Sequence, residues 1–333
     1  MAGSSMTLNI RAHENRFTLL HSVHHGDFWK PCPGTTGGYL CCGYQIITPM
    51  TGCAMHCRYC ILQVYFEDEG RVVFDNFDDL KREINDKMNQ WRGIVRFGTG
   101  EFTDSLYAEE QTGLSVAIAE HLEPWPQAIV EFKTKSAVVS PLARIKRPGK
   151  VIIAFSLNTP RIITLMERNT APLEKRFKAA RQCLDMGFNI AFHFDPIFIY
   201  DGWEREYRAV VDMIYGVVSD VKKFAWCSLG GFRSNPDLKS YLKERKQHLP
   251  LFSGEMITGE DGKLRYFRPI RVEIYRAMQN AFHRHQFDAP LYLCMESPEV
   301  WMESGMMEKI PNGLPAYLDK RAEALLSAEA RRG

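Results

Sequence analysis

Three cysteines stand close together in this sequence, at Cys53, Cys57 and Cys60. Three and then two residues separate them, in a segment that reads as a loop following a strand. Three thiolates on one short loop can bind three irons of a 4Fe–4S cluster, whose usual ligands are four cysteines. The fourth iron would then lack a protein thiolate and would be open to another ligand.

Zinc is the alternative metal for this loop. A structural zinc site takes four ligands, usually as two short pairs that lie far apart in the sequence. Cys41, Cys42 or His56 could supply a fourth ligand here. No second Cys or His pair at zinc spacing follows downstream, so the spacing favours an iron–sulfur cluster.

Composition is typical of a globular enzyme with a large core. Of 333 residues, 45% are hydrophobic and 25% charged, and the net charge of +2 predicts no extended nucleic-acid footprint. No apolar run approaches the ~18 residues of a membrane span, and no apolar region near the N-terminus predicts a signal peptide. The nine cysteines follow no disulfide framework. We therefore expect no membrane association and a reducing, cytoplasmic location.

Short apolar runs alternate with amphipathic stretches along most of the chain. The strand candidates are 39–48, 93–100, 128–134, 150–157, 189–196 and 223–229, with 290–295 as a candidate seventh. The helix candidates are 77–91, 109–121, 137–147, 173–186, 204–218 and 237–246. This alternation predicts βαβ units and a parallel sheet that helices cover on its outer face. We expect an α/β fold, a partial (β/α)6 barrel of the TIM type.

The chain is expected to have three segments. Residues 1–38 form an N-terminal arm and loop, 39–232 the barrel, and 233–333 a C-terminal extension. The extension should carry a β-hairpin at 251–268, because Asp261-Gly262 stands between two strand-like runs.

Polar or glycine residues follow each of the six predicted strands, which would bring them to one rim of a barrel. After the second strand, Gly100 would let a ligand approach the backbone and Glu101 could hold a ligand ammonium group. The alternative for this segment is a tight turn with a helix-capping acid. Lys135, Ser156 and Asn158 follow the third and fourth strands, and their alternatives are a surface lysine and helix caps.

Asp195 and Arg233 follow the fifth and sixth strands and are the candidate catalytic residues. Asp195 would hold a substrate, or it would cap its turn.

The expected hairpin is rich in arginine and aromatic residues. Candidates for nucleic-acid contact are Arg265, Tyr266, Arg268 and Arg271, since arginine binds phosphates and aromatic rings stack on bases. The alternative is a solvated hairpin packed on the barrel.

Several of these segments together resemble the spore photoproduct lyase family of radical S-adenosylmethionine (SAM) enzymes. They are Cys-Ala-Met-His-Cys-Arg-Tyr-Cys-Ile-Leu-Gln, Gly-Thr-Gly-Glu, Ser-Leu-Asn at 156–158, Phe-Asp-Pro at 194–196 and Asp-Gly-Lys-Leu-Arg-Tyr-Phe-Arg-Pro, within residues 32–301. The resemblance implies that a 4Fe–4S cluster on the three cysteines chelates SAM through its open iron. An electron from the cluster then breaks a C–S bond and releases a 5′-deoxyadenosyl radical, which abstracts hydrogen from the substrate.

The resemblance also assigns SAM contacts. Glu101, next to Gly100, would hold the methionyl amino group, and Tyr59 would contact the adenine. Lys135 and Ser156, joined by Asn158, would serve the carboxylate and ribose. The implied partners are a flavodoxin- or ferredoxin-type reductant and DNA, bound through the hairpin.

The activity for which this family is named is repair of a methylene-bridged thymine dimer in DNA, in which a cysteine returns a hydrogen atom. Phe102 stands where the family has that cysteine, and Ile61 where it has a tyrosine proposed to relay the radical. Cys183, Cys227 and Cys294 are candidates to replace the missing cysteine. The remaining alternatives are radical SAM tailoring of another substrate, such as a peptide, and a non-catalytic metal-binding protein.

Overall fold

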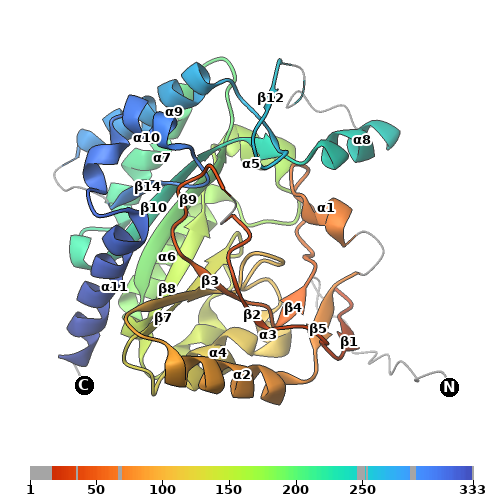
Figure 1. Cartoon of the computed structure of the whole chain (residues 1–333), viewed down its shortest axis with the longest axis vertical. Coiled ribbons are helices and arrows are strands. Elements are labelled where there is room, and N and C mark those ends of the chain that lie inside the picture. Colours follow the sequence, from red (N-terminus) through yellow and green to blue (C-terminus); the bar gives the residue numbers. More distant parts are fainter. Residues whose placement is uncertain are drawn as a thin grey trace.

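A computed structural model describes residues 17–34, 37–66, 70–245, 252, 254–285 and 290–331 (Figure 1). Its main feature is an eight-stranded sheet with the order β14-β10-β9-β8-β7-β6-β3-β2. These strands are β2 (Trp29–Pro31), β3 (Gln45–Ile47), β6 (Val95–Gly98), β7 (Ala128–Thr134), β8 (Val151–Ser156), β9 (Asn189–Ile197), β10 (Phe224–Gly231) and β14 (Leu291–Leu293).

The seven strands from β3 to β14 pair in parallel, and β2 is an antiparallel edge strand. The six predicted strands all occur in this sheet, and the candidate seventh strand joins it as β14. The predicted α/β half-barrel is confirmed. One sheet takes strands from each of the three expected segments, because β2 precedes residue 39 and β14 follows residue 233.

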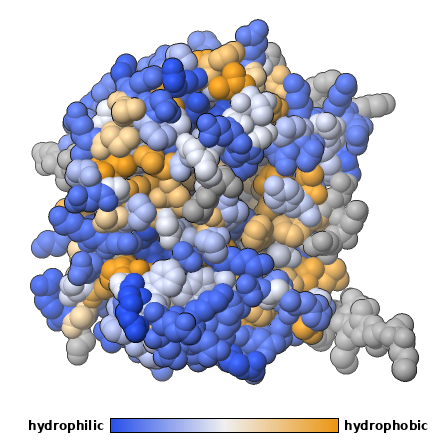
Figure 2. All heavy atoms as spheres, in the orientation of Figure 1, coloured by the Kyte–Doolittle hydropathy of each residue, from blue (hydrophilic) through white to orange (hydrophobic). Residues whose placement is uncertain are grey.

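Helices cover the convex side of the sheet (Figure 1). Those that contact strands of the sheet are α2 (Phe77–Gln90), α4 (Leu114–Leu122), α6 (Leu173–Asp185), α9 (Arg268–His283) and α11 (Leu314–Ala330). Helices α7 (Trp203–Val217) and α10 (Pro298–Glu303) pack against α9, α3 (Glu109–Thr112) precedes α4, and α5 (Pro160–Met166) packs with the residues around Cys57. Two further helices, α1 (Leu62–Tyr65) and α8 (Pro236–Glu244), pack against each other. Short 3-10 turns occupy Ser140–Arg144, Pro148–Lys150, Val221–Lys223 and Met306–Lys309. On the face of the molecule seen in Figure 2, most side chains are hydrophilic, and hydrophobic residues gather mainly at mid-height.

Two small sheets flank the half-barrel. One has the order β1-β5-β4, from β1 (Leu20–Ser22), β5 (Val72–Phe74) and β4 (Met50–Thr51). The other joins β11 (Arg233–Ser234) to the predicted hairpin, whose strands are β12 (Ile257–Thr258) and β13 (Leu264–Arg265).

Some predicted helices differ from the observed ones. The helix expected at 137–147 is wrong: a 3-10 turn stands there, because Pro141 begins the turn and Pro148 prevents its continuation. The helix expected at 109–121 is divided at Gly113, whose φ of +63° ends α3. Lys246, the predicted end of α8, and residues 1–16 of the expected arm lie outside the described residues. No described helix is both long and apolar enough to cross a membrane.

The concave side of the sheet carries a buried polar row. The Glu131 carboxylate on β7 hydrogen-bonds Nε2 of His193 on β9, and Nδ1 of the same ring lies 2.5 Å from the Ser228 hydroxyl on β10. Glu131 and His193 meet across the intervening strand β8, which the curl of the sheet allows on its concave face. Each ring nitrogen has a partner, so burial of this row leaves no orphaned imidazole nitrogen.

Candidate functional site

The cysteine loop begins at a glycine that no other residue could replace without strain. Gly52 follows β4 with φ +77°, and a Cβ atom there would lie 2.1 Å from the carbonyl oxygen of Gly70. Its N–H donates to the Phe102 carbonyl, and its own carbonyl accepts from the Thr103 hydroxyl. The loop is therefore fixed to the segment after β6 before the first cysteine is reached.

We expect Gly52→Ala to lower the free energy of unfolding by about 1–3 kcal/mol, because it forces an L side chain into a strained backbone conformation beside a fixed carbonyl. Urea denaturation measures the loss. Gly216→Ala is the matched control: that glycine lies in α7 with open space around it, and alanine there should be neutral or stabilising. Equal stability of Gly52→Ala and wild type would contradict this account of the loop.

The three thiols on this loop lie near one another. Burial, and then the Asp104 carboxylate, raises the pKa of Cys53 to about 12, and Cys60 contributes to the rise. Burial also raises the pKa of Cys57, with Cys60 and Cys53 adding to it and Lys135 opposing it. The protein alone therefore keeps these groups as neutral thiols, and a bound metal would deprotonate them.

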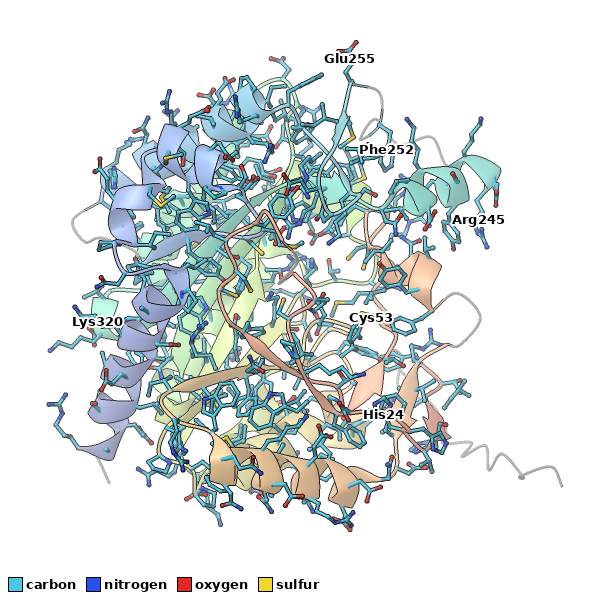
Figure 3. The ribbon with its side chains drawn as sticks, viewed as in Figure 1. His24, Cys53, Arg245, Phe252, Glu255 and Lys320 are labelled. Atoms are coloured by element: carbon cyan, nitrogen blue, oxygen red, sulfur yellow. The ribbon has the colours of Figure 1, made fainter. Side chains whose placement is uncertain are left out.

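The donor set suits an iron–sulfur cluster. The Cys60 N–H donates to the Cys57 carbonyl, and the Gln63 side-chain amide donates to the same oxygen at 2.7 Å, which shapes a tight turn around the last two thiols. A cavity of about 170 Å³ lies against Cys53 and Cys60. Figure 3 shows Cys53 near the centre of the open face. Within the described ranges no three His, Cys, Asp or Glu side chains converge on a single-ion site. A cubane binds each thiolate to a different iron, so it does not require that convergence.

Of the other zinc ligands considered from the sequence, Cys42 lies apart from this loop, whereas His56 belongs to it. The carbonyl of Cys42 accepts a hydrogen bond from buried Arg96 on β6, and Cys294 and Cys41 influence the pKa of the Cys42 thiol. Exposed His56 lies on the loop and lines the cavity beside Cys53 and Cys60.

A buried ion pair lies directly behind the cysteine loop. The Tyr59 hydroxyl donates to Glu167 at 2.5 Å, and the other oxygen of that carboxylate accepts from Arg176 at 2.5 Å. Arg176 also donates to the carbonyls of Ser156 and Ala171, so its guanidinium is held by several partners. The Tyr59 ring, which sequence reasoning assigned to adenine, is buried and packs near Phe198.

Sequence reasoning missed Glu167 and Arg176. The sequence predicted a helix at 173–186, which is confirmed as α6, but it indicated no partner for the carboxylate that precedes this helix. The only local signal is a charged pair flanking a helix start, which is common on protein surfaces.

Asp104 organises the loop that follows β6. Its Oδ1 accepts from the N–H groups of Leu106 and Tyr107 and from the Thr134 hydroxyl, and its Oδ2 accepts from the Lys135 N–H at 2.6 Å. Two of these four bonds, from Thr134 and Lys135, join the β6 loop to the end of β7. Sequence reasoning missed this residue as well, because an aspartate in a loop is most often solvated.

The predicted SAM residues lie at the same rim, but they differ in solvent exposure. Glu101 is exposed, and its charge influences Cys60, Cys32 and Lys133. The Lys135 ammonium lies 5.9 Å from the Tyr59 ring centre, beside the cysteine loop.

Ser156 and Asn158 lie deeper in the rim. Both are buried. The Asn158 amide donates to the Pro196 carbonyl and accepts from the Tyr207 hydroxyl, so it joins the ends of β8 and β9.

The two candidate catalytic residues are brought together. Arg233 makes a two-point contact with Asp195, at 3.1 and 2.9 Å. Burial alone would raise the pKa of Asp195, but the Arg233 charge holds that pKa below its usual range. Nη2 of Arg233, which binds Oδ2 of Asp195, also lies 3.5 Å from the Cys294 sulfur.

The predicted nucleic-acid residues divide into two groups. Arg265 is 2% exposed and pairs with Asp261, and Arg271 is buried against Glu296. Arg268 keeps 52% of its side chain exposed, next to exposed Phe267.

Half-buried Tyr266 completes this set. Its hydroxyl accepts from the N–H of Ile199. The surface available to a ligand is therefore narrower than the sequence pattern suggested.

Comparison with known proteins places the chain in a family. The family model for spore photoproduct lyase matches residues 42–225, more than half of the chain. The chain belongs to this family. The spore photoproduct lyase of Clostridium acetobutylicum is 28% identical over 164 residues, which are 49% of each chain. That of Bacillus subtilis is 28% identical over 166 residues, 49% of this chain and 48% of that protein. The match thus spans about half the length of these relatives.

Solved structures agree in fold. A spore photoproduct lyase complexed with dinucleoside spore photoproduct has a TM-score of 0.73 and 22% identity, covering 83% of this chain and 82% of that one. A variant with bound AdoMet and the same dinucleoside has a TM-score of 0.71, with 22% identity over 83% and 81% of the two chains. At this identity the likeness establishes the half-barrel architecture.

The two departures from the spore photoproduct lyase pattern lie beside the cysteine loop. The Phe102 ring packs edge-on near Phe66, and its carbonyl accepts from the Gly52 N–H. Ile61 directly follows Cys60 and is the N-cap residue of α1. Both positions therefore adjoin the loop, and both hold apolar side chains.

Proposed function

We propose that this protein is a radical SAM enzyme that holds a 4Fe–4S cluster on Cys53, Cys57 and Cys60, with SAM beside it. One observation carries the proposal: three thiols stand on one loop at the carboxyl-end rim of a parallel half-barrel, in a chain of the spore photoproduct lyase family. When bound together, the cluster and SAM supply a 5′-deoxyadenosyl radical for hydrogen abstraction.

The remaining rim residues bind SAM and hold the cysteine loop in position. Exposed Glu101, beside Gly100, offers a carboxylate to the methionyl amino group of SAM, and the Lys135 ammonium serves its carboxylate. Ser156 completes the rim, where Asn158 holds the ends of β8 and β9 in place. Tyr59 is anchored by Glu167, so it keeps the cysteine loop against the barrel.

The substrate in this proposal is a thymine-dimer lesion in DNA, the spore photoproduct. Family membership supports this choice, since solved relatives hold a dinucleoside form of the lesion. Asp195 and Arg233 would supply a charged pair to the substrate at the ends of β9 and β10. The duplex would lie along the hairpin of β12 and β13, and a flavodoxin- or ferredoxin-type protein would supply electrons.

Anaerobic reconstitution with iron and sulfide tests the proposal. We expect a 4Fe–4S absorbance band that bleaches on reduction, and 5′-deoxyadenosine formed from SAM. Dinucleoside spore photoproduct should stimulate that formation and be converted to two thymidine molecules, each of half its mass. A single tetrahedral metal ion would sink the enzyme proposal. SAM cleavage that no nucleic-acid lesion stimulates would remove the repair assignment and favour another substrate, such as a peptide.

Arg268→Ala should weaken binding to duplex DNA and reduce the slope of log affinity against log salt by about 1, because an exposed guanidinium that would exchange its surface ion pair with Glu303 for a phosphate is lost. Fluorescence anisotropy over a salt series measures both. Arg181→Ala, an exposed arginine on α6, is the control and should bind as wild type does. An unchanged salt slope for Arg268→Ala would remove the hairpin from the DNA-binding surface.

A further inference from the structure

The cysteines outside the metal-binding loop differ in their access to the rim. Cys183 and Cys227 are 0% exposed and belong to the hydrophobic core. Cys294 directly follows β14 and is partly exposed. Of the three candidates that could replace the family's cysteine, it alone has access to solvent.

Cys294 forms a hydrogen-bonded polar cluster with Asp195 and Arg233. Arg233 binds both oxygens of Asp195 and reaches the Cys294 sulfur. Asp195 also accepts from the thiol, which helps to lower its pKa. The group has no spare room behind it, since a Cβ atom on Gly230 would lie 2.6 Å from Asp195 Oδ1.

The backbone after this cysteine is constrained as well. Met295, the next residue, has a φ of +54°, which is uncommon for a residue other than glycine. Strained positions of this kind persist where the surrounding structure holds them, and they cluster at active sites.

The group faces the same rim as the cysteine loop. The charge of Lys133 on β7 influences Cys294, Asp195 and Glu101, so these residues lie around one lysine. Glu101 in turn influences Cys60, the last cysteine of the loop. Cys294 follows β14, and Asp195 and Arg233 lie where the neighbouring parallel strands β9 and β10 end, so the group stands at the carboxyl-end rim of the sheet.

We propose that Cys294 is the hydrogen-atom donor that ends the reaction, in place of the cysteine that the family has where Phe102 stands here. This inference rests on the proposed function. The S–H bond of Cys294 breaks homolytically, and its hydrogen atom forms a C–H bond on the product carbon radical. One unpaired electron stays on the sulfur, and one electron from the low-potential reductant with a proton from water restores the thiol.

The thiol is in the form that this step needs. Burial, and then the Asp195 carboxylate, raises the pKa of Cys294 to about 12, so the S–H hydrogen is present at neutral pH. Asp195 and Arg233 act as positioning residues, because they hold the sulfur without removing its proton. Cys32, which shares the influence of Lys133 and Glu101, is the competing donor that an experiment must separate.

Solvent deuterium provides the first test. The reconstituted enzyme is run in D2O with SAM and dinucleoside spore photoproduct, so that exchangeable thiols carry deuterium. The wild-type product should contain one deuterium. Cys294→Ser should still form 5′-deoxyadenosine but lose the label, because serine keeps the size and hydrogen bonding of the residue while its O–H bond is too strong to donate. Cys227→Ala, a core cysteine, should label as wild type does.

Two outcomes of this test overturn the inference while leaving the proposed function in place. One is full labelling by Cys294→Ser, which would mean that its role is structural. The other is loss of the label in Cys32→Ala with Cys294→Ser unaffected. A wild type in which the dinucleoside stimulates no SAM cleavage defeats the repair proposal itself.

Thiol alkylation gives a second readout that does not depend on turnover. Prolonged treatment with iodoacetamide followed by peptide mass spectrometry should modify Cys294 slowly, because little of it is thiolate, and should leave the fully buried Cys183 and Cys227 intact. Dinucleoside spore photoproduct, the probe ligand, should protect Cys294. Unchanged modification of Cys294 in a wild type whose SAM cleavage the dinucleoside does stimulate would overturn the inference, since a donor must lie against its substrate.

Discussion

Cys57→Ala will abolish cluster binding and SAM cleavage, while the half-barrel still folds. Removing one of three thiolates leaves two irons without protein ligands, which is too few to retain a cubane in this loop. The substitution removes a single buried sulfur from a small hydrophobic cluster, so the free energy of unfolding should fall by only about 1 kcal/mol. Iron and sulfide content after anaerobic reconstitution, together with circular dichroism, measures the two effects separately.

Cys183→Ala is the matched control for this variant. It removes an equally buried sulfur, from α6 on the far side of the sheet, and it should keep full iron content and SAM cleavage. A Cys57→Ala protein that retains a SAM-cleaving cluster would contradict the assignment of the loop. An unfolded one would show that the loop has a larger structural role than its packing indicates.

Arg176→Met should lower the free energy of unfolding by about 3–5 kcal/mol, because it leaves the buried Glu167 carboxylate without its partner. The same change frees the Ser156 and Ala171 carbonyls and releases Tyr59 from a fixed acceptor. We therefore expect lower iron content after reconstitution as well. Urea denaturation of the wild type and the variant gives the difference in stability.

A second substitution tests the physical reason. Adding Glu167→Gln to Arg176→Met removes the unpaired charge, so the double variant should be less destabilised than the sum of the two single variants. Arg181→Met on the same helix is the control, because Arg181 is exposed and donates only to the Gly216 carbonyl in the described structure. Additive effects of the two buried substitutions would show that the ion pair is not the source of the loss.

Patterns that depend on near neighbours were predictable from the sequence. The cysteine loop, the six strands and the hairpin turn follow from spacing, from alternation of apolar runs and from Asp261-Gly262, all of which act over a few residues. The helix predicted at 137–147 is wrong for a local reason too, because Pro141 and Pro148 disfavour a continuous α-helix there and 3-10 turns form instead.

Tertiary structure alone decided which polar groups meet. Arg233 contacts Asp195, 38 residues away, and Cys294, 61 residues away, because the curled sheet brings the ends of β9, β10 and β14 together. It also decided which charges a nucleic acid could reach: Arg265 is buried in an ion pair, whereas Arg268, three residues on, is exposed. Residue types and their spacing specify strands, turns and a metal-binding loop, because those interactions span short stretches of chain. The partner of each charge depends on how distant strands cross, which no short stretch of sequence encodes.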